Sequence, residues 1–130
     1  MLVHMAISDA YGAAFEFIPP DQARDHGLVN DASGYGVNPE TALGAGRYTD
    51  DTQMAIAIAE LVLGGVDFGP VSVADAFVGG FQRDPRRGYS RRLQSALENA
   101  ATGADLLNAI TPNSTRSEAA MRAGPIAFLD

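Results

Sequence analysis

Arg47-Tyr-Thr-Asp-Asp-Thr-Gln-Met-Ala55 leads directly into an apolar segment that runs to residue 63. Residues 51–64 are apolar on nearly every face, with Met54, Ile58 and Leu61 among them, and such a helix is usually buried. The glycine pair at 64–65 is a typical helix end. The stretch therefore predicts a central, buried helix that carries two adjacent carboxylates at its first turn.

The remainder of the chain also predicts helices. Residues 2–17 contain few helix breakers, and Pro19 and Pro20 would end a helix there, with Glu16 in its last turn. Residues 21–46 are rich in Gly, Asp, Asn and Pro, which indicates a loop with one short helical turn at 22–26. Further helices are predicted at residues 72–85, 90–101 and 105–110, and a last one opened by Thr115-Arg-Ser-Glu118 that meets Pro125. Since no alternating strand pattern or internal repeat is found, the predicted fold class is all-α.

Composition narrows the class of protein. The chain has 130 residues, the size of one domain, with 46% hydrophobic and 19% charged residues, as in soluble globular proteins. A formal charge of −7 would repel a nucleic-acid backbone, and the absence of cysteine excludes disulfides and thiolate metal sites. No apolar run reaches the roughly 20 residues of a membrane span, and no signal peptide is recognised. We expect no nucleic-acid or membrane partner and a cytoplasmic location.

Thr49, Asp50, Asp51 and Thr52 allow two interpretations. They could cap the helix, because hydroxyls and carboxylates at a first turn accept free backbone N–H groups and complement the helix dipole. However, adjacent carboxylates on a buried helix need a cation or protons to be tolerated. Oxygen ligands without cysteine favour Mg²⁺ or Mn²⁺ over Zn²⁺.

Asp9, Gly12 and Glu16 are three and then four residues apart, so a continuous helix would place them on one face. A solvated polar stripe is the ordinary interpretation of such spacing. Yet Glu16 would lie at a helix C-terminus, where the dipole disfavours an anion, and its neighbours are apolar. This placement indicates a compensating cation, and Gly12 would leave room for a ligand or another backbone.

Two arginine features also have alternative explanations. The cluster at Arg83, Arg86, Arg87, Arg91 and Arg92 could hold a diphosphate, although such runs are more often a solvated face. Arg122 follows Met121 in a segment of small and apolar residues, and we expect it to be a structural arginine paired with an acid.

Three segments, in the same order, resemble the ADP-ribosylglycohydrolase family. Ser8-Asp9-Ala10-Tyr11-Gly12 followed by Glu16 is similar to its Gly-Asp-Ala-x-Gly-x-x-x-Glu signature, with Ser8 in place of glycine. The stretch at 47–55 resembles its metal motif. Ala119-Ala-Met-Arg-Ala-Gly-Pro-Ile126 resembles its Gly-x-x-Met-Arg-x-x-Pro segment, where Ser117-Glu118 replaces the usual Asn-Gly pair.

The resemblance implies a multi-helix orthogonal bundle and magnesium-dependent hydrolysis of ADP-ribosyl linkages. It implies that Glu16 is the catalytic acid or base and that Thr49, Asp50 and Asp51 are metal ligands. It also implies that Asp9, Gly12, Met121 and Arg122 contribute to substrate binding, with Asp9 acting as a support. The partner would be ADP-ribose or an ADP-ribosylated protein, and the complete family site holds two metals.

The resemblance implies that residues 1–130 are the N-terminal part of that fold, since the family's downstream Gly-Asp-x-Asp-Thr motif is not found among them. We therefore expect weak metal binding and weak turnover from this polypeptide by itself. The alternatives are a catalytically impaired ADP-ribose-binding or regulatory module, or a truncated fragment without function. A homo-oligomer or a complementing chain could cover the unfinished core, and the acceptor is left open.

Overall fold

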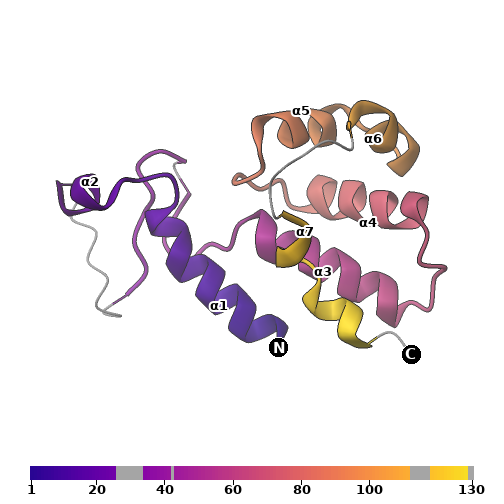
Figure 1. Cartoon of the computed structure of the whole chain (residues 1–130), viewed down its shortest axis with the longest axis horizontal. Coiled ribbons are helices and arrows are strands. Elements are labelled where there is room, and N and C mark those ends of the chain that lie inside the picture. The colour runs from indigo at the N-terminus through magenta and orange to yellow at the C-terminus, as the bar shows by residue number, and fades with distance from the viewer. Residues whose placement is uncertain (26–33, 42, 112–117, 129–130) are drawn as a thin grey trace. The chain divides into compact units, whose positions relative to one another are not determined.

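The computed structural model describes residues 1–25, 34–41, 43–111 and 118–128. All regular structure within these ranges is helical (Figure 1). The elements are α1 (Leu2–Gly12), η1 (Ala13–Phe15), α2 (Pro20–Asp25), α3 (Asp50–Leu63), α4 (Pro70–Arg83), α5 (Arg91–Asn99), α6 (Gly103–Ala109), α7 (Glu118–Met121) and η2 (Gly124–Phe128). The all-α prediction is confirmed. None of the helices in these ranges is long and apolar enough to cross a membrane.

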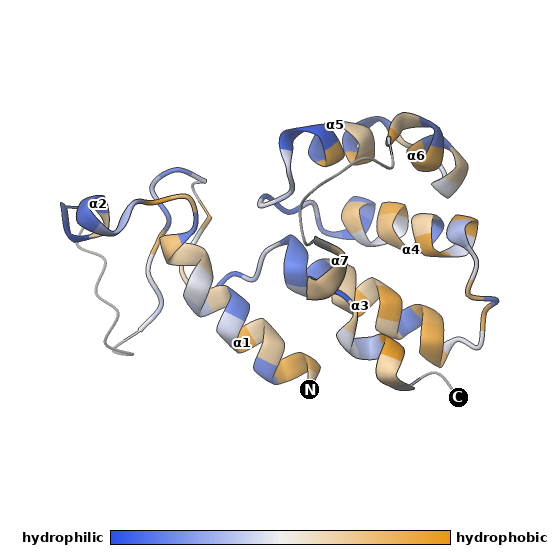
Figure 2. Ribbon diagram, in the orientation of Figure 1, coloured by the Kyte–Doolittle hydropathy of each residue, from blue (hydrophilic) through white to orange (hydrophobic). Residues whose placement is uncertain are grey.

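The chain divides into two compact units, Met1–Thr49 and Asp50–Asp130. In the second unit, α3 packs against α4, α7 and η2, and α4 also packs against α5 and α6. Figure 2 shows apolar residues along both α3 and α4. Met54, Ile58, Phe77, Phe81 and Leu97 belong to the core. The predicted central helix is therefore confirmed, and it ends, as expected, before the glycine pair at 64–65.

Two helix starts in this unit differ from the prediction. α4 begins at Pro70, directly after its N-cap Gly69, and not near residue 72, because proline favours the first helical position, where no N–H partner is needed. α6 begins at Gly103 with a reciprocal capping box between Thr102 and Asp105. The Thr102 hydroxyl and then its backbone N–H, both donating to the Asp105 carboxylate at 2.8 Å, lower the pKa of Asp105. A Thr-x-x-Asp pattern in the sequence is the signal for this cap.

The last predicted capping box lies mostly outside the described residues, which resume with α7 at Glu118. Pro125 was expected to end that helix. Instead, α7 already ends at Met121, and Pro125 lies inside the short 3-10 helix η2. Proline is tolerated there because the first turn of a helix leaves its N–H groups without helical acceptors.

In the first unit, α1 is shorter than predicted. It ends at Gly12, and one 3-10 turn leads to Glu16, whose backbone is extended (φ −61°, ψ 136°). The expectation that Glu16 lies in the last turn of the helix is wrong. The carbonyl of Ala13 would bond the N–H of Phe17 in a continuing helix, but it accepts instead from the Asn38 side chain at 2.7 Å. The short helix predicted at 22–26 is observed as α2, which begins two residues earlier, at Pro20; residue 26 lies outside the described residues.

Candidate functional site

The first two signature segments are joined by a pair of hydrogen bonds within the Met1–Thr49 unit. Asp9, on α1, accepts from the backbone N–H of Thr49 through Oδ2 at 3.0 Å. Its Oδ1 accepts from the Thr49 hydroxyl at 2.7 Å. Thr49 is only 1% exposed, so water cannot readily substitute for this carboxylate. Asp9 therefore holds both the backbone and the side chain of Thr49, and its predicted supporting role in substrate binding stays a prediction.

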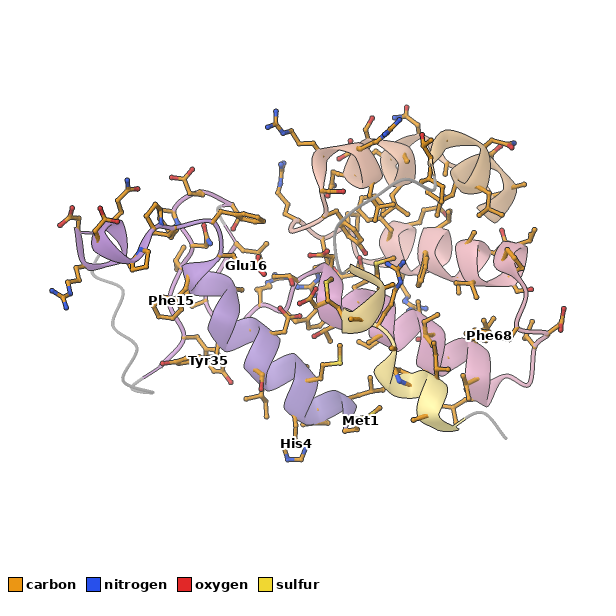
Figure 3. All side chains as sticks on the ribbon, in the orientation of Figure 1. Met1, His4, Phe15, Glu16, Tyr35 and Phe68 are labelled. Atoms are coloured by element: carbon orange, nitrogen blue, oxygen red, sulfur yellow. The ribbon has the colours of Figure 1, made fainter. Side chains whose placement is uncertain are left out.

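Glu16 lies just beyond α1, next to Phe15 (Figure 3). Because its backbone is extended, it does not continue the helical face of Asp9 and Gly12, and the expectation of one shared helical face is wrong for Glu16. The Ile18 N–H donates to the Phe15 carbonyl at 3.3 Å, which closes a turn around Glu16. Gly12 is exposed, and among the described residues no atom would lie within 4 Å of a Cβ added there.

Asn38 is a second residue that shapes this region, and sequence reasoning gave it no role. Its side-chain amide donates to the carbonyls of Ala13 at 2.7 Å and Glu16 at 3.0 Å. Its Oδ1 accepts from the backbone N–H groups of Glu40 at 2.8 Å and Thr41 at 3.0 Å. The Asn38-Pro39 pair signals a turn in the sequence, but no local pattern reveals a reach across more than twenty residues.

Asp50 and Asp51 form the first turn of α3. Asp50 is 7% exposed and Asp51 is half-buried, so the expectation that these carboxylates are partly buried is confirmed. Acidic side chains in the first turn of a helix interact favourably with the helix dipole. Thr52, next along the chain, is fully buried.

Gln53 connects the start of α3 to the last turn of α4 and to the loop that follows it. Its Nε2 donates to the carbonyls of Gly80 at 3.3 Å and Asp84 at 2.6 Å. Its Oε1 accepts from the buried Tyr89 hydroxyl at 2.7 Å. The residue lies inside the motif that the sequence singled out, yet only the structure reveals this tethering role.

Met121 is the last residue of α7, and Arg122 follows it directly. The Arg122 guanidinium donates to the sulfur of Met54 at 3.2 Å and lies 5.1 Å from the centre of the Phe77 ring. A guanidinium over an aromatic face is stabilised by the ring quadrupole. These contacts place Arg122 against core residues of α3 and α4. The acidic partner expected for it stays a prediction.

The arginine cluster is engaged in separate local contacts. Arg83 forms a two-point ion pair with Glu60 on the exposed surface, and Arg86 pairs with Asp84. Arg92 donates to the Thr111 hydroxyl at 2.8 Å. A shallow depression of about 520 Å³ lies at Arg86 and Arg87, and its other lining residues are Phe81, Gln82, Pro85, Gln94, Leu97, Glu98 and Ala100. The diphosphate-binding interpretation of this cluster stays a prediction.

The predicted metal ligands Thr49, Asp50 and Asp51 all carry oxygen atoms. The Thr49 hydroxyl donates its hydrogen to Asp9. The lone pairs of the Thr49 hydroxyl oxygen are therefore the groups that can face a cation. Asp50 and Asp51 add carboxylate oxygens, the ligands that Mg²⁺ prefers. The donor set therefore fits Mg²⁺ or Mn²⁺. Across the described ranges, three or more His, Cys, Asp or Glu side chains are nowhere grouped to hold a metal ion.

Comparison with known proteins gives two matches and one negative result. The family model described as ADP-ribosylglycohydrolase matches residues 1–130. The ADP-ribosylarginine hydrolase Tri1 of Pseudomonas putida (strain GB-1) is 40% identical over 77 residues, which are 59% of this chain and 19% of that protein's length. No solved structure matches significantly. Since the family model covers every residue, the chain belongs to the ADP-ribosylglycohydrolase family.

Proposed function

We propose that the chain contributes to the magnesium-dependent hydrolysis of an ADP-ribosyl linkage, with ADP-ribosylarginine as the first substrate class to test. The observation that carries this proposal is the pair of hydrogen bonds that Thr49 donates to the Asp9 carboxylate, because they join two of the three family-like segments. The acceptor is suggested by the printed name of the relative from Pseudomonas putida.

In this proposal Glu16 transfers a proton to or from the group that attacks or leaves the anomeric carbon. A carboxyl group in that role must reach the reacting oxygen directly or through one water. The turn around Glu16 holds its backbone in a defined direction, which favours such a role over that of a mobile surface acid. Asp9 orients Thr49, and Thr49, Asp50 and Asp51 would hold the cation.

A bound Mg²⁺ would polarise substrate oxygens and help to orient a water near the anomeric carbon. The Asp9–Thr49 pair supports this assignment because it turns the oxygen lone pairs of Thr49 away from Asp9. Met121 and Arg122 are proposed to contribute to substrate binding through the short α7 segment, whose position is stabilised by the contacts of Arg122 with Met54 and Phe77.

The test is the release of ADP-ribose from ADP-ribosylarginine, measured by chromatography under single-turnover conditions with the chain in excess. We expect release that needs Mg²⁺ and that falls about 100-fold or more in Glu16→Gln, the range that general acid–base catalysis contributes. Glu40→Gln is the matched control, because Glu40 is exposed in the same unit and should leave release unchanged.

Release that is equal in Glu16→Gln and the unsubstituted chain would rule out the proposed role of Glu16. Release that persists without any divalent cation would rule out the magnesium site. Calorimetric titration with ADP-ribose and Mg²⁺ separates the alternative function: tight binding without hydrolysis would favour an ADP-ribose-binding module.

A further inference from the structure

The turn that presents Glu16 has an unusual backbone. Glu16 has φ −61° and ψ 136°, Phe17 has φ 62°, and the Ile18 N–H bonds to the Phe15 carbonyl at 3.3 Å. These angles are typical of a type II turn, which requires a positive φ at its third residue and usually places glycine there. In the described residues, Phe17 is the one non-glycine residue with a positive φ.

A bulky residue keeps a left-handed conformation only where its surroundings impose it. Burial of the Phe17 ring does not supply this constraint, since the residue is 67% exposed. The chain on either side must therefore hold the turn. Asn38 supplies that constraint, because it bonds the Ala13 carbonyl before the turn and the Glu16 carbonyl within it.

Asn38 is suited to this task because its hydrogen-bonding capacity is fully used. A side-chain amide has two N–H groups and two acceptor lone pairs, and all four are engaged here. The residue is 1% exposed. Its oxygen holds the turn at Pro39, and its nitrogen holds the turn at Glu16. The two turns are thus locked to each other through one side chain.

The Asn38–Glu16 bond also limits the direction of the Glu16 side chain. A hydrogen bond to the Glu16 carbonyl fixes the peptide plane between Glu16 and Phe17, and the bond to Ala13 fixes the chain that enters the turn. We propose that Asn38 is a positioning residue for Glu16, which sets the direction of the carboxyl group without touching the substrate. This inference rests on the proposed function, in which Glu16 is the acid or base.

The test uses substitutions at Asn38 that keep an acceptor oxygen but remove the two N–H donors of the amide. Asn38→Asp and Asn38→Ser both keep an oxygen for the N–H groups of Glu40 and Thr41, and neither can donate two hydrogen bonds across to the turn. If the buried charge in Asn38→Asp prevents folding, the uncharged variant Asn38→Ser still tests the proposal. Thr41→Val is the matched control, because its hydroxyl accepts only from the nearby Leu43 N–H in the described contacts.

The first measurement is amide hydrogen exchange, which does not depend on activity. We expect the Ile18 amide to exchange about tenfold faster in both Asn38 variants, the scale of a lost buried hydrogen bond. The Glu40 amide should keep its protection, and Thr41→Val should leave Ile18 unchanged. If Ile18 exchange is unaltered in Asn38→Ser, the proposal is overturned.

The second measurement is the release of ADP-ribose. We expect kcat to fall about tenfold or more in Asn38→Ser with little change in KM, because a small misplacement of a reacting group slows chemistry strongly. Phe17→Gly in the same background should recover part of kcat, since glycine adopts a positive φ without strain. Faster Ile18 exchange with normal kcat would refute the positioning role. If the unsubstituted chain releases no ADP-ribose, the proposed function fails, while Ile18 exchange still decides whether Asn38 holds the turn.

Discussion

Replacing Thr49 with valine should weaken the Met1–Thr49 unit through a single lost hydrogen bond. Valine has nearly the same shape as threonine but cannot donate to Asp9, whose Oδ1 lies 2.7 Å from the threonine hydroxyl. Hydrogen bonds to charged groups contribute about 1.5–3 kcal/mol. Because Thr49 is 1% exposed, water cannot replace the missing donor, and we expect a loss of about 2 kcal/mol.

A double-mutant cycle isolates this contribution. Thr49→Val and Asp9→Ala are measured singly and together, with hydrogen exchange of the α1 amides in urea reporting the opening of this unit. A coupling free energy of about 1.5 kcal/mol or more is expected between the two positions. Values below about 0.5 kcal/mol, the ordinary limit of additivity, would refute the reasoning.

The same variant tests the metal proposal. Thr49→Ser keeps the hydroxyl and should retain most of the Mg²⁺ affinity measured by calorimetry, whereas Thr49→Val should lose about tenfold or more, the lower range seen when groups supporting a metal site are removed. Equal affinities in the two variants would contradict the assignment of Thr49 as a ligand.

Three further predictions concern the Asp50–Asp130 unit, each checked by urea unfolding followed by circular dichroism. Gly103→Ala should lower the free energy of unfolding by about 1–3 kcal/mol, because the added Cβ would lie 2.4 Å from a backbone nitrogen of α4. Gly79→Ala is the control, and it should be neutral or stabilising because its Cβ meets no described atom within 4 Å. Equal effects of the two substitutions would contradict this packing. Tyr89→Phe should cost about 1–3 kcal/mol, because it leaves the buried oxygen of Gln53 without the hydroxyl that donates to it at 2.7 Å, and an unchanged stability would show that this bond is dispensable. Folding lowers the pKa of Asp105, so its carboxylate should stabilise the fold at pH values above the ordinary pKa of 3.8, and this stabilisation should be lost as the pH falls through the lowered pKa of the folded state. Asp105→Asn should lack this pH-dependent loss of stability. Identical pH profiles of stability in the two proteins would disprove the prediction.

The central helix could be predicted because its signals are local. Residues 51–64 combine continuous apolar faces with a glycine stop, and the observed α3 differs by one residue at each end. The failure at Glu16 has the opposite cause. Residues 2–17 contain few helix breakers, but the Asn38 amide competes for the Ala13 carbonyl that a longer helix needs. A contact between residues 25 apart leaves no trace in the local pattern.

The candidate site shows the same division. Thr49, Asp50 and Asp51 stand out as adjacent oxygen donors before an apolar helix, so composition and order suffice to select them. Asp9 could be selected from its segment, but the hydrogen bonds that it accepts from Thr49 join residues 40 positions apart, which no local pattern predicts. The roles of Asn38 and Gln53 depend on amide groups that bond to backbone carbonyls, which every sequence supplies equally.

The loop after α4 is held mainly through its backbone rather than through its side chains. Gln53 bonds the backbone oxygens of Gly80, in the last turn of α4, and of Asp84, which follows the helix, with Tyr89 as its one described side-chain partner in the loop. The side chains at Arg86 and Arg87 can therefore be exchanged without removing the tether. Because Arg86 is largely buried and pairs with Asp84, whereas Arg87 is exposed, substitutions at Arg87 should disturb the path of this loop less than substitutions at Arg86.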